Sequence, residues 1–439
     1  MTDQDVFEDC RFGDIDFSFS PVFQSFIVHN RELGRSRCVL RSLKELALLQ
    51  ISRYSSLTLA AVSSVPVSLL SDLLHLSVSF HRLHQLALLV KTWPMPVLKL
   101  LNNGGGYDYI EEIRTNVDQR KHDFKMKSEV AITALNKTIP SVQSEEISCI
   151  NCLDITNFPM TFRFLSQTSA SLGSSRSLRV ISDVVVTDSK VSIFRDFNFT
   201  LQVRHLHLCC HDCHGVSSEK LYHLLTQLKL LPNIDLNYLE GLQISRLDLR
   251  AAFSEHQTSG SQGQASEFFA FISEEFPNIS CLDLSYNAVN LNGDERATSI
   301  LQKFLSSLSK LNRLNIGGNR LTNKVPSILR DSPGLQYLNL TGTQLRQLDV
   351  SYLATLIWIN HLDLSSNKLH NKLNVLRRML EQLHNLQILE IIDCDLDDEC
   401  LDEIIPAFKI LEKLEVVNLT NNLILRHDFN VNQCRILTG

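Results

Sequence analysis

The sequence lacks the features that mark membrane-spanning and nucleic-acid-binding proteins. No run of lysines and arginines forms a basic tail, and the formal net charge is −6, which argues against a basic nucleic-acid-binding face. The longest uncharged window near the front, residues 54–71, is diluted by six serines, a threonine and Pro66, so it is a poor membrane span. Residues 1–17 are acidic where a secretory signal peptide is basic. We therefore expect neither a membrane nor a nucleic acid as a partner.

Cysteine usage bears on the compartment in which the protein works. There are 11 cysteines, an odd number, scattered through segments that read as buried. This pattern favours reduced thiols packed in a core over a disulfide framework. Together with the acidic first residues, it predicts a protein of the cytoplasm or the nucleus.

Motifs for catalysis and metal binding are missing as well. The glycine-rich stretch 102–109 lacks the lysine of a phosphate-binding loop, and no nucleophile-elbow, zinc-protease or kinase signature occurs. Segment 205–214, HLHLCCHDCH, has a composition typical of zinc sites. In strand register, however, His205 and His207 point outward while the leucines between them point inward, so the ligands diverge. We predict no enzymatic activity, no cofactor and no metal.

Internal repetition is the strongest pattern that is present. The template L-x-x-L-x-L-x-x-N-x-L recurs at residues 279–289, 311–321, 335–345, 359–369, 386–396 and 414–424. Successive starts are 32, 24, 24, 27 and 28 residues apart, close to the period of leucine-rich repeats. Between them, segments 297–308 and 375–383 have apolar residues at helical spacing. We predict an α/β fold, a leucine-rich repeat solenoid curved like a horseshoe, with parallel strands on the concave face and helices outside.

The asparagine position of the template predicts a structural role. It is filled by Asn287, Asn319, Asn367 and Asn422, and by Thr343 and Cys394 in the two other repeats. An asparagine side chain can satisfy buried backbone groups where the chain turns away from the strand. Threonine and cysteine are small enough to take the same place.

Weaker strands precede the regular array. Segments 150–158, 203–213 and 244–250 resemble the template at irregular spacing, so the early repeats need longer connections, such as the polar stretches 166–177 and 254–266. We divide the chain into an acidic, partly disordered segment (1–40), a helical cap (41–100), a connector (101–145), the leucine-rich repeat domain (146–426) and a short tail (427–439).

The predicted concave face is polar. Its outward-pointing positions form one column of Asp248, Asp283, Asn315, Asn339, Asp363, Glu390 and Asn418, beside a second of Arg246, Arg313, Tyr337 and His361. Repeat proteins usually bind their partners on this face. One interpretation is that any exposed strand face must be polar. The other is a binding surface for a basic or hydrogen-bonding protein, and the sequence leaves both open.

The segment before the array, SLKELALLQI, predicts an amphipathic helix. Ser42 and Glu45 have the spacing of a capping box. Leu43, Ala47 and Ile51 then fall on one stripe, with Leu46 beside them. The stripe fits either a core helix that caps the solenoid or a helix that contacts a partner, and the small Ala47 lets a partner approach closely.

The spacing of this stripe also fits an elongin C-binding box, which has leucine first, a small residue four later and an apolar residue four after that. About 15 residues downstream, VPVSLL (65–70) resembles a cullin-2 box, and its Pro66 suits the first turn of a helix. The wider segment 42–100 resembles the N-terminal region of the PRAME and leucine-rich repeat-containing protein 14 family. The family's Trp-Pro-x-Pro element is matched at residues 93–96, its first strand at 150–158 and its Leu-x-Leu-Cys-Cys segment at 206–210.

This resemblance implies a non-catalytic substrate-recognition subunit of a cullin-2 RING ubiquitin ligase. Carried over by position, the elongin C contacts, made together with elongin B, are Leu43, Leu46, Ala47 and Ile51, and the cullin-selecting residues are Val65, Pro66, Leu69 and Leu70. The concave strands are expected to hold a protein substrate. The sequence departs from the family in a less aromatic cullin segment, where Ser71 and Asp72 stand, and we expect the family's longer C-terminal segment to be absent or eroded.

The alternative is a leucine-rich repeat scaffold or inhibitor that sequesters a signalling protein, such as a kinase of the NF-kappa-B pathway, without recruiting a ligase. Residues 42–100 would then be only a structural cap. The two hypotheses differ in whether the stripe of Leu43, Ala47 and Ile51 is exposed or buried, because exposed apolar stripes mark interfaces.

Overall fold

The computed structural model describes residues 47–48, 50–79, 82–99, 150–155, 169, 178–187, 194–209, 218–245, 264–287, 289–292, 294–332, 334–425 and 434–437. These residues form one 13-stranded sheet in the order β1-β2-β3-β4-β6-β7-β8-β9-β10-β11-β12-β13, with β5 paired to β4. The pairings are parallel throughout. Neighbouring strands therefore follow chain order, and the sheet grows by one strand per repeat.

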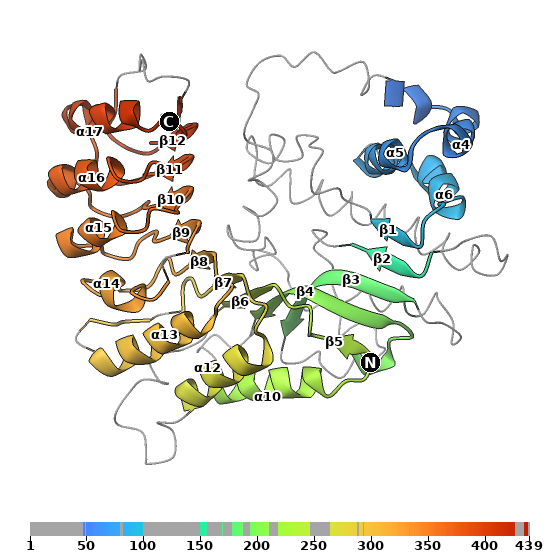
Figure 1. Cartoon of the computed structure of the whole chain (residues 1–439), viewed down its shortest axis with the longest axis horizontal. Coiled ribbons are helices and arrows are strands. Elements are labelled where there is room, and N and C mark those ends of the chain that lie inside the picture. The colour runs from blue at the N-terminus through green and yellow to red at the C-terminus, as the bar shows by residue number, and fades with distance from the viewer. Residues whose placement is uncertain are drawn as a thin grey trace, which may run out of the picture.

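The sheet curves into an arc with helices along its outside (Figure 1). The strands are β1 (Val97–Lys99), β2 (Cys152–Asp154), β3 (Arg179–Thr187), β4 (Thr200–Cys209), β5 (Ile234–Asp235), β6 (Gly241–Ser245), β7 (Cys281–Asp283), β8 (Arg313–Asn315), β9 (Tyr337–Asn339), β10 (His361–Asp363), β11 (Ile388–Glu390), β12 (Val416–Asn418) and β13 (Arg435–Leu437). The chain is a leucine-rich repeat solenoid, as predicted.

The helices fall into two groups. At one end of the arc lie α4 (Ser55–Ser64), α5 (Val67–Ser79) and α6 (Leu83–Lys91). Along the outer side of the sheet lie α10 (Ser218–Lys229), α12 (Gln264–Glu275), α13 (Glu295–Ser307), α14 (Val325–Ile328), α15 (Gln347–Leu353), the 3-10 turn η2 (His370–Lys372), α16 (Leu373–Leu380) and α17 (Asp398–Ile410). Nowhere in the described part of the chain is a helix long and apolar enough to cross a membrane.

Each predicted repeat contains one of the strands β7 to β12. Two of the three weaker segments also hold a described strand at the expected place, β2 and β4, whereas β6 begins before segment 244–250, most of which lies outside the described residues. The strands β1, β3, β5 and β13 were not predicted. β1 lies within the predicted cap and β13 within the predicted tail, so the sheet extends beyond 146–426 at both ends. Segments 1–40 and 101–145 lie outside the described residues, as do nearly all of 166–177 and most of 254–266.

The core runs along the sheet as a column of aliphatic side chains. The middle residue of each three-residue strand from β7 to β12 is fully buried, namely Leu282, Leu314, Leu338, Leu362, Leu389 and Val417. Because side chains alternate along a strand, the two flanking residues of each strand lie on the opposite face. Burial of each such side chain contributes about 1.5–3 kcal/mol.

The asparagine position satisfies the backbone as predicted. The Asn319 amide nitrogen donates to the carbonyls of Leu284 (2.9 Å) and Ile316 (3.0 Å), while its oxygen accepts from the Val289 N–H (3.0 Å). Asn367 and Asn422 bond in the same way to a carbonyl and an N–H group of the repeat before them. Thr343 keeps only the bond within its own repeat, to the Leu340 carbonyl, so the substitution costs one link between neighbours.

The residue before this position turns the chain with a positive φ in every one of the six repeats. These residues are Tyr286, Gly318, Gly342, Ser366, Asp393 and Asn421, with φ between 53° and 68°. Only two are glycine, although this backbone region favours glycine. At Gly318 a Cβ atom would lie 2.2 Å from the Tyr286 ring, so glycine lets the ring of the preceding repeat rest on the backbone.

A buried carboxylate, which the sequence analysis did not identify, joins two helices. Asp349 accepts hydrogen bonds from the Arg346 N–H (2.8 Å), at the start of α15, and from the Asn323 (2.9 Å) and Val325 (3.1 Å) N–H groups, at the start of α14. Burial raises the pKa of Asp349, and the three N–H donors oppose that rise by favouring the charged form. The carboxylate therefore holds two successive repeats together.

The asparagine position makes a direct prediction for stability. Asn319→Ala leaves a buried N–H and two buried carbonyls without their side-chain partner, and we expect it to lower the free energy of unfolding by about 2–4 kcal/mol. The exposed Asn374 on α16 offers a matched control, and Asn374→Ala should change stability by less than about 0.5 kcal/mol. Urea unfolding followed by circular dichroism measures both, and equal effects of the two variants would contradict the structural role.

Candidate functional site

The strand register places the predicted binding residues in two columns. From β7 to β12 the columns read Cys281, Arg313, Tyr337, His361, Ile388 and Val416 in one, and Asp283, Asn315, Asn339, Asp363, Glu390 and Asn418 in the other. Asp248 and Arg246 lie outside the described residues. The structure thus brings the described members together on the face opposite the core leucines, while their role in binding stays a prediction.

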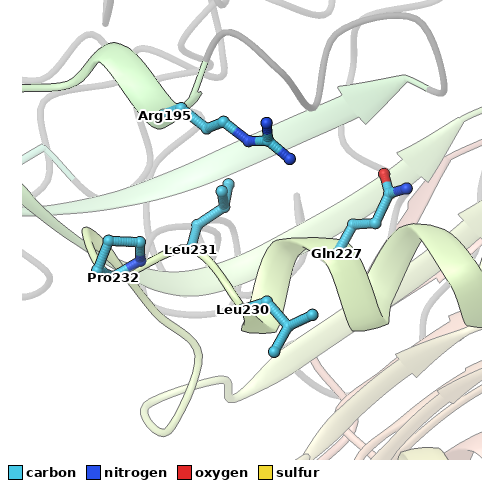
Figure 2. A pocket seen from close by; sticks show the side chains of 5 residues that line it. All are labelled: Arg195, Gln227, Leu230, Leu231 and Pro232. Atoms are coloured by element: carbon cyan, nitrogen blue, oxygen red, sulfur yellow. The ribbon is translucent and has the colours of Figure 1, made fainter.

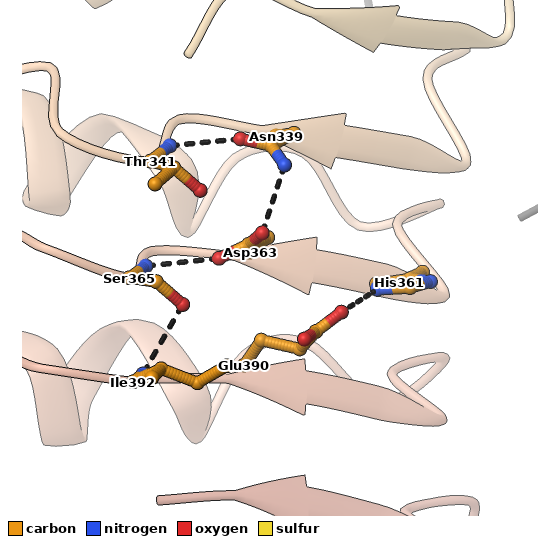
Figure 3. A network of polar contacts seen from close by, with 7 residues as sticks. All are labelled: Asn339, Thr341, His361, Asp363, Ser365, Glu390 and Ile392. Atoms are coloured by element: carbon orange, nitrogen blue, oxygen red, sulfur yellow. Dashed lines mark hydrogen bonds and ion pairs between the residues drawn. The ribbon is translucent and has the colours of Figure 1, made fainter. Parts of the chain in front are cut away.

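Much of the second column is buried rather than projecting into solvent. Asp283, Asn315, Asn339 and Asp363 are between 0% and 8% exposed. Figure 3 shows the reason in β9 and β10: the Asn339 amide donates to the Asp363 carboxylate (2.8 Å), and each side chain also accepts from the backbone N–H two residues further on. The same lateral bond joins Asn315 to Asp283 (3.0 Å). These residues form a structural ladder, and the expectation of a freely exposed polar column is wrong for them.

The first column contains a row of interacting rings and charges. The Arg313 guanidinium lies 5.4 Å from the Tyr337 ring centroid, and that ring meets His361 edge-on at 4.7 Å. His361 Nε2 lies 2.9 Å from Glu390 Oε1 (Figure 3). Tyr337 is almost fully buried, and burial raises its pKa well above the usual value, so its hydroxyl stays protonated. This row links four successive repeats across the concave face.

The groups that remain accessible are few. Glu390 keeps 28% of its side chain exposed, and Arg313 and Asn418 are half-buried. Burial raises the pKa of Asp363, and the nearby Glu390 carboxylate raises it further, so adding a positive group at this place would relieve like-charge repulsion. The accessible part of the concave face therefore suits a partner that brings hydrogen-bond donors or a basic side chain.

The two described histidines of segment 205–214 do not reach solvent. His205, Leu206, His207 and Leu208 are all buried on β4, so the expectation that the two histidines are exposed is wrong. Burial lowers the pKa of His207 to about 4, which keeps its imidazole neutral at physiological pH. No group of three or more histidine, cysteine or acidic side chains placed to hold a metal ion occurs among the described residues.

The described cysteines are poorly suited to nucleophilic chemistry. Cys281 is fully buried, and burial raises the pKa of its thiol. Burial likewise raises the pKa of Cys394 to about 12, and its sulfur donates to the Leu364 carbonyl in the place of the template asparagine. Because the thiolate is the reactive form, these side chains serve packing.

The proposed elongin-contact helix is partly described. Leu43 and Leu46 lie outside the described residues, whereas Ala47, Leu48, Gln50 and Ile51 are helical. Ala47 is exposed and Ile51 is half-buried, while Leu48 packs into the core of the cap. The helix therefore packs through one side and presents Ala47 on another.

The cullin-selecting residues are divided between surface and core. Pro66 directly precedes α5, where its carbonyl accepts from the Leu69 (2.9 Å) and Leu70 (3.2 Å) N–H groups, and it is exposed. Val65 and Leu69 are half-buried. Leu70 is only 1% exposed and belongs to the hydrophobic core, so its assignment to a partner surface is wrong.

Two further exposed residues next to this helix escaped the sequence analysis. Tyr54 is 57% and Leu57 is 46% exposed, although both are large and apolar. Two hydrogen bonds hold this segment beside the box: the Tyr54 N–H donates to the Ile51 carbonyl (3.2 Å), and the Thr58 side-chain hydroxyl donates to the same oxygen (3.0 Å). Their spacing from Ile51, at i+3 and i+6, is the sequence pattern that could have identified them.

Comparison with known proteins agrees with the fold and goes no further. No protein-family profile and no curated protein sequence matches the chain. Similar solved structures include the leucine-rich repeat-containing protein LegL7 from Legionella pneumophila, with 17% identity over 64% of this chain and 78% of that chain and a TM-score of 0.36. Internalin InlF from Listeria monocytogenes has 14% identity over 66% of this chain and 80% of that chain, with a TM-score of 0.33. The TLR13–ssRNA13 complex has 18% identity over 63% of this chain and 33% of that chain, with a TM-score of 0.34.

The buried His207 predicts an acid-sensitive fold. Its folded pKa of about 4 lies below the ordinary 6.5, so its contribution is fully present above pH 6.5 and is lost as the pH falls towards 4. We expect the wild type to lose about 3 kcal/mol more free energy of unfolding between pH 7 and pH 4 than His207→Gln does. Urea titrations at both pH values measure this difference.

His384→Gln is the matched control, because His384 is exposed and the same substitution should leave the pH dependence of the wild type intact. A His207→Gln variant with the full wild-type pH dependence would show that other groups cause it.

Proposed function

We propose that the chain is the non-catalytic substrate-recognition subunit of an elongin B/C–cullin-2 RING ubiquitin ligase, working in the cytoplasm or the nucleus. The proposal begins with the resemblance of residues 42–100 to the PRAME and leucine-rich repeat-containing protein 14 family. The observation that carries it is the exposure of Ala47 on a helix whose opposite side, at Leu48, packs into the cap. Because Ala47 is both small and exposed, a partner can approach the helix backbone closely at this point.

The surface around Ala47 has the character of a protein interface. Ile51 is half-buried, and the neighbouring Tyr54 and Leu57 expose about half of their apolar surface. Isolated exposed apolar residues are common, but several within a short stretch of sequence fit a surface that a partner covers. We therefore propose that elongin C packs over Ala47 and Ile51 and extends towards Leu57.

The cullin contact is proposed at the start of α5. Pro66 is exposed and Val65 and Leu69 are half-buried, so these three residues can touch a partner while the helix keeps its core contacts. Leu70 holds the helix in the cap and is left out of the contact. Elongin and cullin would then bind neighbouring turns of one helical unit.

The substrate would be a protein held on the concave face. Arg313, Glu390 and Asn418 are the partly exposed members of the two columns, and the buried ladder behind them keeps their backbone in register. A substrate with a basic or hydrogen-bonding surface fits this set. The fold supports protein binding, and the choice of substrate is set by these side chains.

A pull-down with purified elongin B–C tests the proposed helix. We expect the wild type to capture elongin B–C and Ala47→Asp to lose capture at least tenfold, because a charge would be buried in an apolar contact. Gln50→Asp is the matched control, since Gln50 is exposed on the same helix but outside the apolar stripe. Leu43→Asp is expected to behave like Ala47→Asp. All three variants should keep the melting temperature of the wild type.

A second pull-down separates the cullin contact. Val65→Asp is expected to abolish cullin-2 capture from an elongin-bound complex while elongin capture remains, because Val65 lies between α4 and α5 and not on the elongin stripe. If the wild type captures neither protein, the chain is a capped repeat scaffold, and sequestration of a signalling protein becomes the better explanation.

A further inference from the structure

A pocket lies on the outer, helical side of the solenoid, away from the concave columns. It has a volume of about 420 Å³ and is lined by Arg195, Gln227, Leu230, Leu231 and Pro232. Arg195 comes from a 3-10 turn before β4, and the other residues come from the end of α10 and the loop that follows it (Figure 2). This volume is within the usual range for small-ligand and side-chain pockets.

The two walls of the pocket are tied together. The Asn233 side-chain amide, next to Pro232, donates to the carbonyls of Phe194 and Phe197 in the turn that carries Arg195, the latter at 3.3 Å. Phe197 meets Phe194 edge-on at 5.3 Å and stacks on Phe199 at 5.1 Å. The turn and the loop therefore form one unit, and the pocket exists before a ligand binds.

The polar groups of the pocket are a cation and an amide. Arg195 is exposed, and within the described part of the chain no acidic side chain forms an ion pair with it. Gln227 Nε2 lies 3.0 Å from His223 Nε2, which orients the carboxamide and leaves its oxygen to accept a hydrogen bond. In Figure 2 the ends of the Arg195 and Gln227 side chains extend from opposite walls above Leu231.

The apolar side of the pocket is unusually exposed. Leu230 is 77% exposed at the end of α10, beside the buried Leu231 and the exposed Pro232. Leaving a leucine in water is unfavourable, and covering it would recover about 25 cal/mol per Å² of apolar surface. The pocket thus combines an apolar leucine surface with a cation that has no ion-pair partner among the described residues.

We propose that this pocket binds a peptide segment of a partner protein in which an acidic residue adjoins a leucine-like residue. The carboxylate bonds the Arg195 guanidinium, whose fork matches two carboxylate oxygens. A peptide N–H donates to the Gln227 oxygen, and the apolar side chain covers Leu230 and Pro232. A single cation beside an apolar floor suits a carboxylate better than a doubly charged phosphate. This inference is independent of ligase recruitment, because the pocket shares no residue with the cap.

A binding titration with the full chain tests the pocket. The probe is a fluorescein-labelled peptide with the core leucine-aspartate-leucine and an amidated end, followed by fluorescence anisotropy. We expect Arg195→Gln to weaken binding at least tenfold, through loss of a charge-assisted bond, and Gln227→Ala to weaken it by a smaller factor. Arg378→Gln is the matched control, because Arg378 is exposed on α16, far from the pocket along the chain, and should bind as the wild type.

Three variants of the peptide probe test which of its chemical groups the pocket recognises. A leucine-asparagine-leucine peptide should bind at least tenfold more weakly, and so should one with alanines in place of the leucines. Equal binding of the asparagine peptide, or unchanged binding by Arg195→Gln at wild-type melting temperature, would overturn the proposal. So would the absence of binding to the wild type. Stronger binding of a peptide with a free C-terminal leucine and no acidic side chain would assign the pocket to chain termini instead.

Discussion

The structure depends on how each repeat satisfies its backbone where the chain leaves the strand. At that turn the N–H and carbonyl groups are buried and cannot reach water, and leaving them unpaired costs about 1–3 kcal/mol each. Asn319 meets this need by bonding to Leu284 in the preceding repeat and to Val289 beside it. Each repeat is thus completed by its neighbour, which makes the solenoid a cooperative stack rather than a row of separate units.

The same principle governs the concave face. Asp363 and Asn339 use their side chains to bond one another and the local backbone, and Tyr337 is enclosed between Arg313 and His361. Polar residues at these positions therefore hold the strands in register first, and only the partly exposed ones remain for a partner. A substitution in the ladder would disturb the sheet as well as any bound protein, so binding and stability are coupled on this face.

The residues that are most accessible to a partner lie outside the concave face. The cap presents Ala47 and Pro66 on helices whose other sides are packed, and its last element, β1, pairs with β2. At that point the cap is thus joined to the sheet by backbone hydrogen bonds. The pocket at Arg195 occupies the outer side, so a partner there leaves both the cap and the concave strands free.

Local pattern determined much of this molecule. The spacing of leucines and asparagines over 279–424 defined the fold, the strands β7 to β12 and the bonding role of Asn319, because alternation along a strand and a fixed turn decide which side chains are buried. The prediction that the polar column is exposed was wrong, because the side-chain bond between Asn339 and Asp363 joins neighbouring strands that are separated in sequence. Likewise, helical spacing placed Val65 to Leu70 on a helix start but could not tell which of them faces the core. The pocket at Arg195 joins a turn and a helix end that only tertiary packing brings together, through the Asn233 amide, so no local sequence signal could have revealed it.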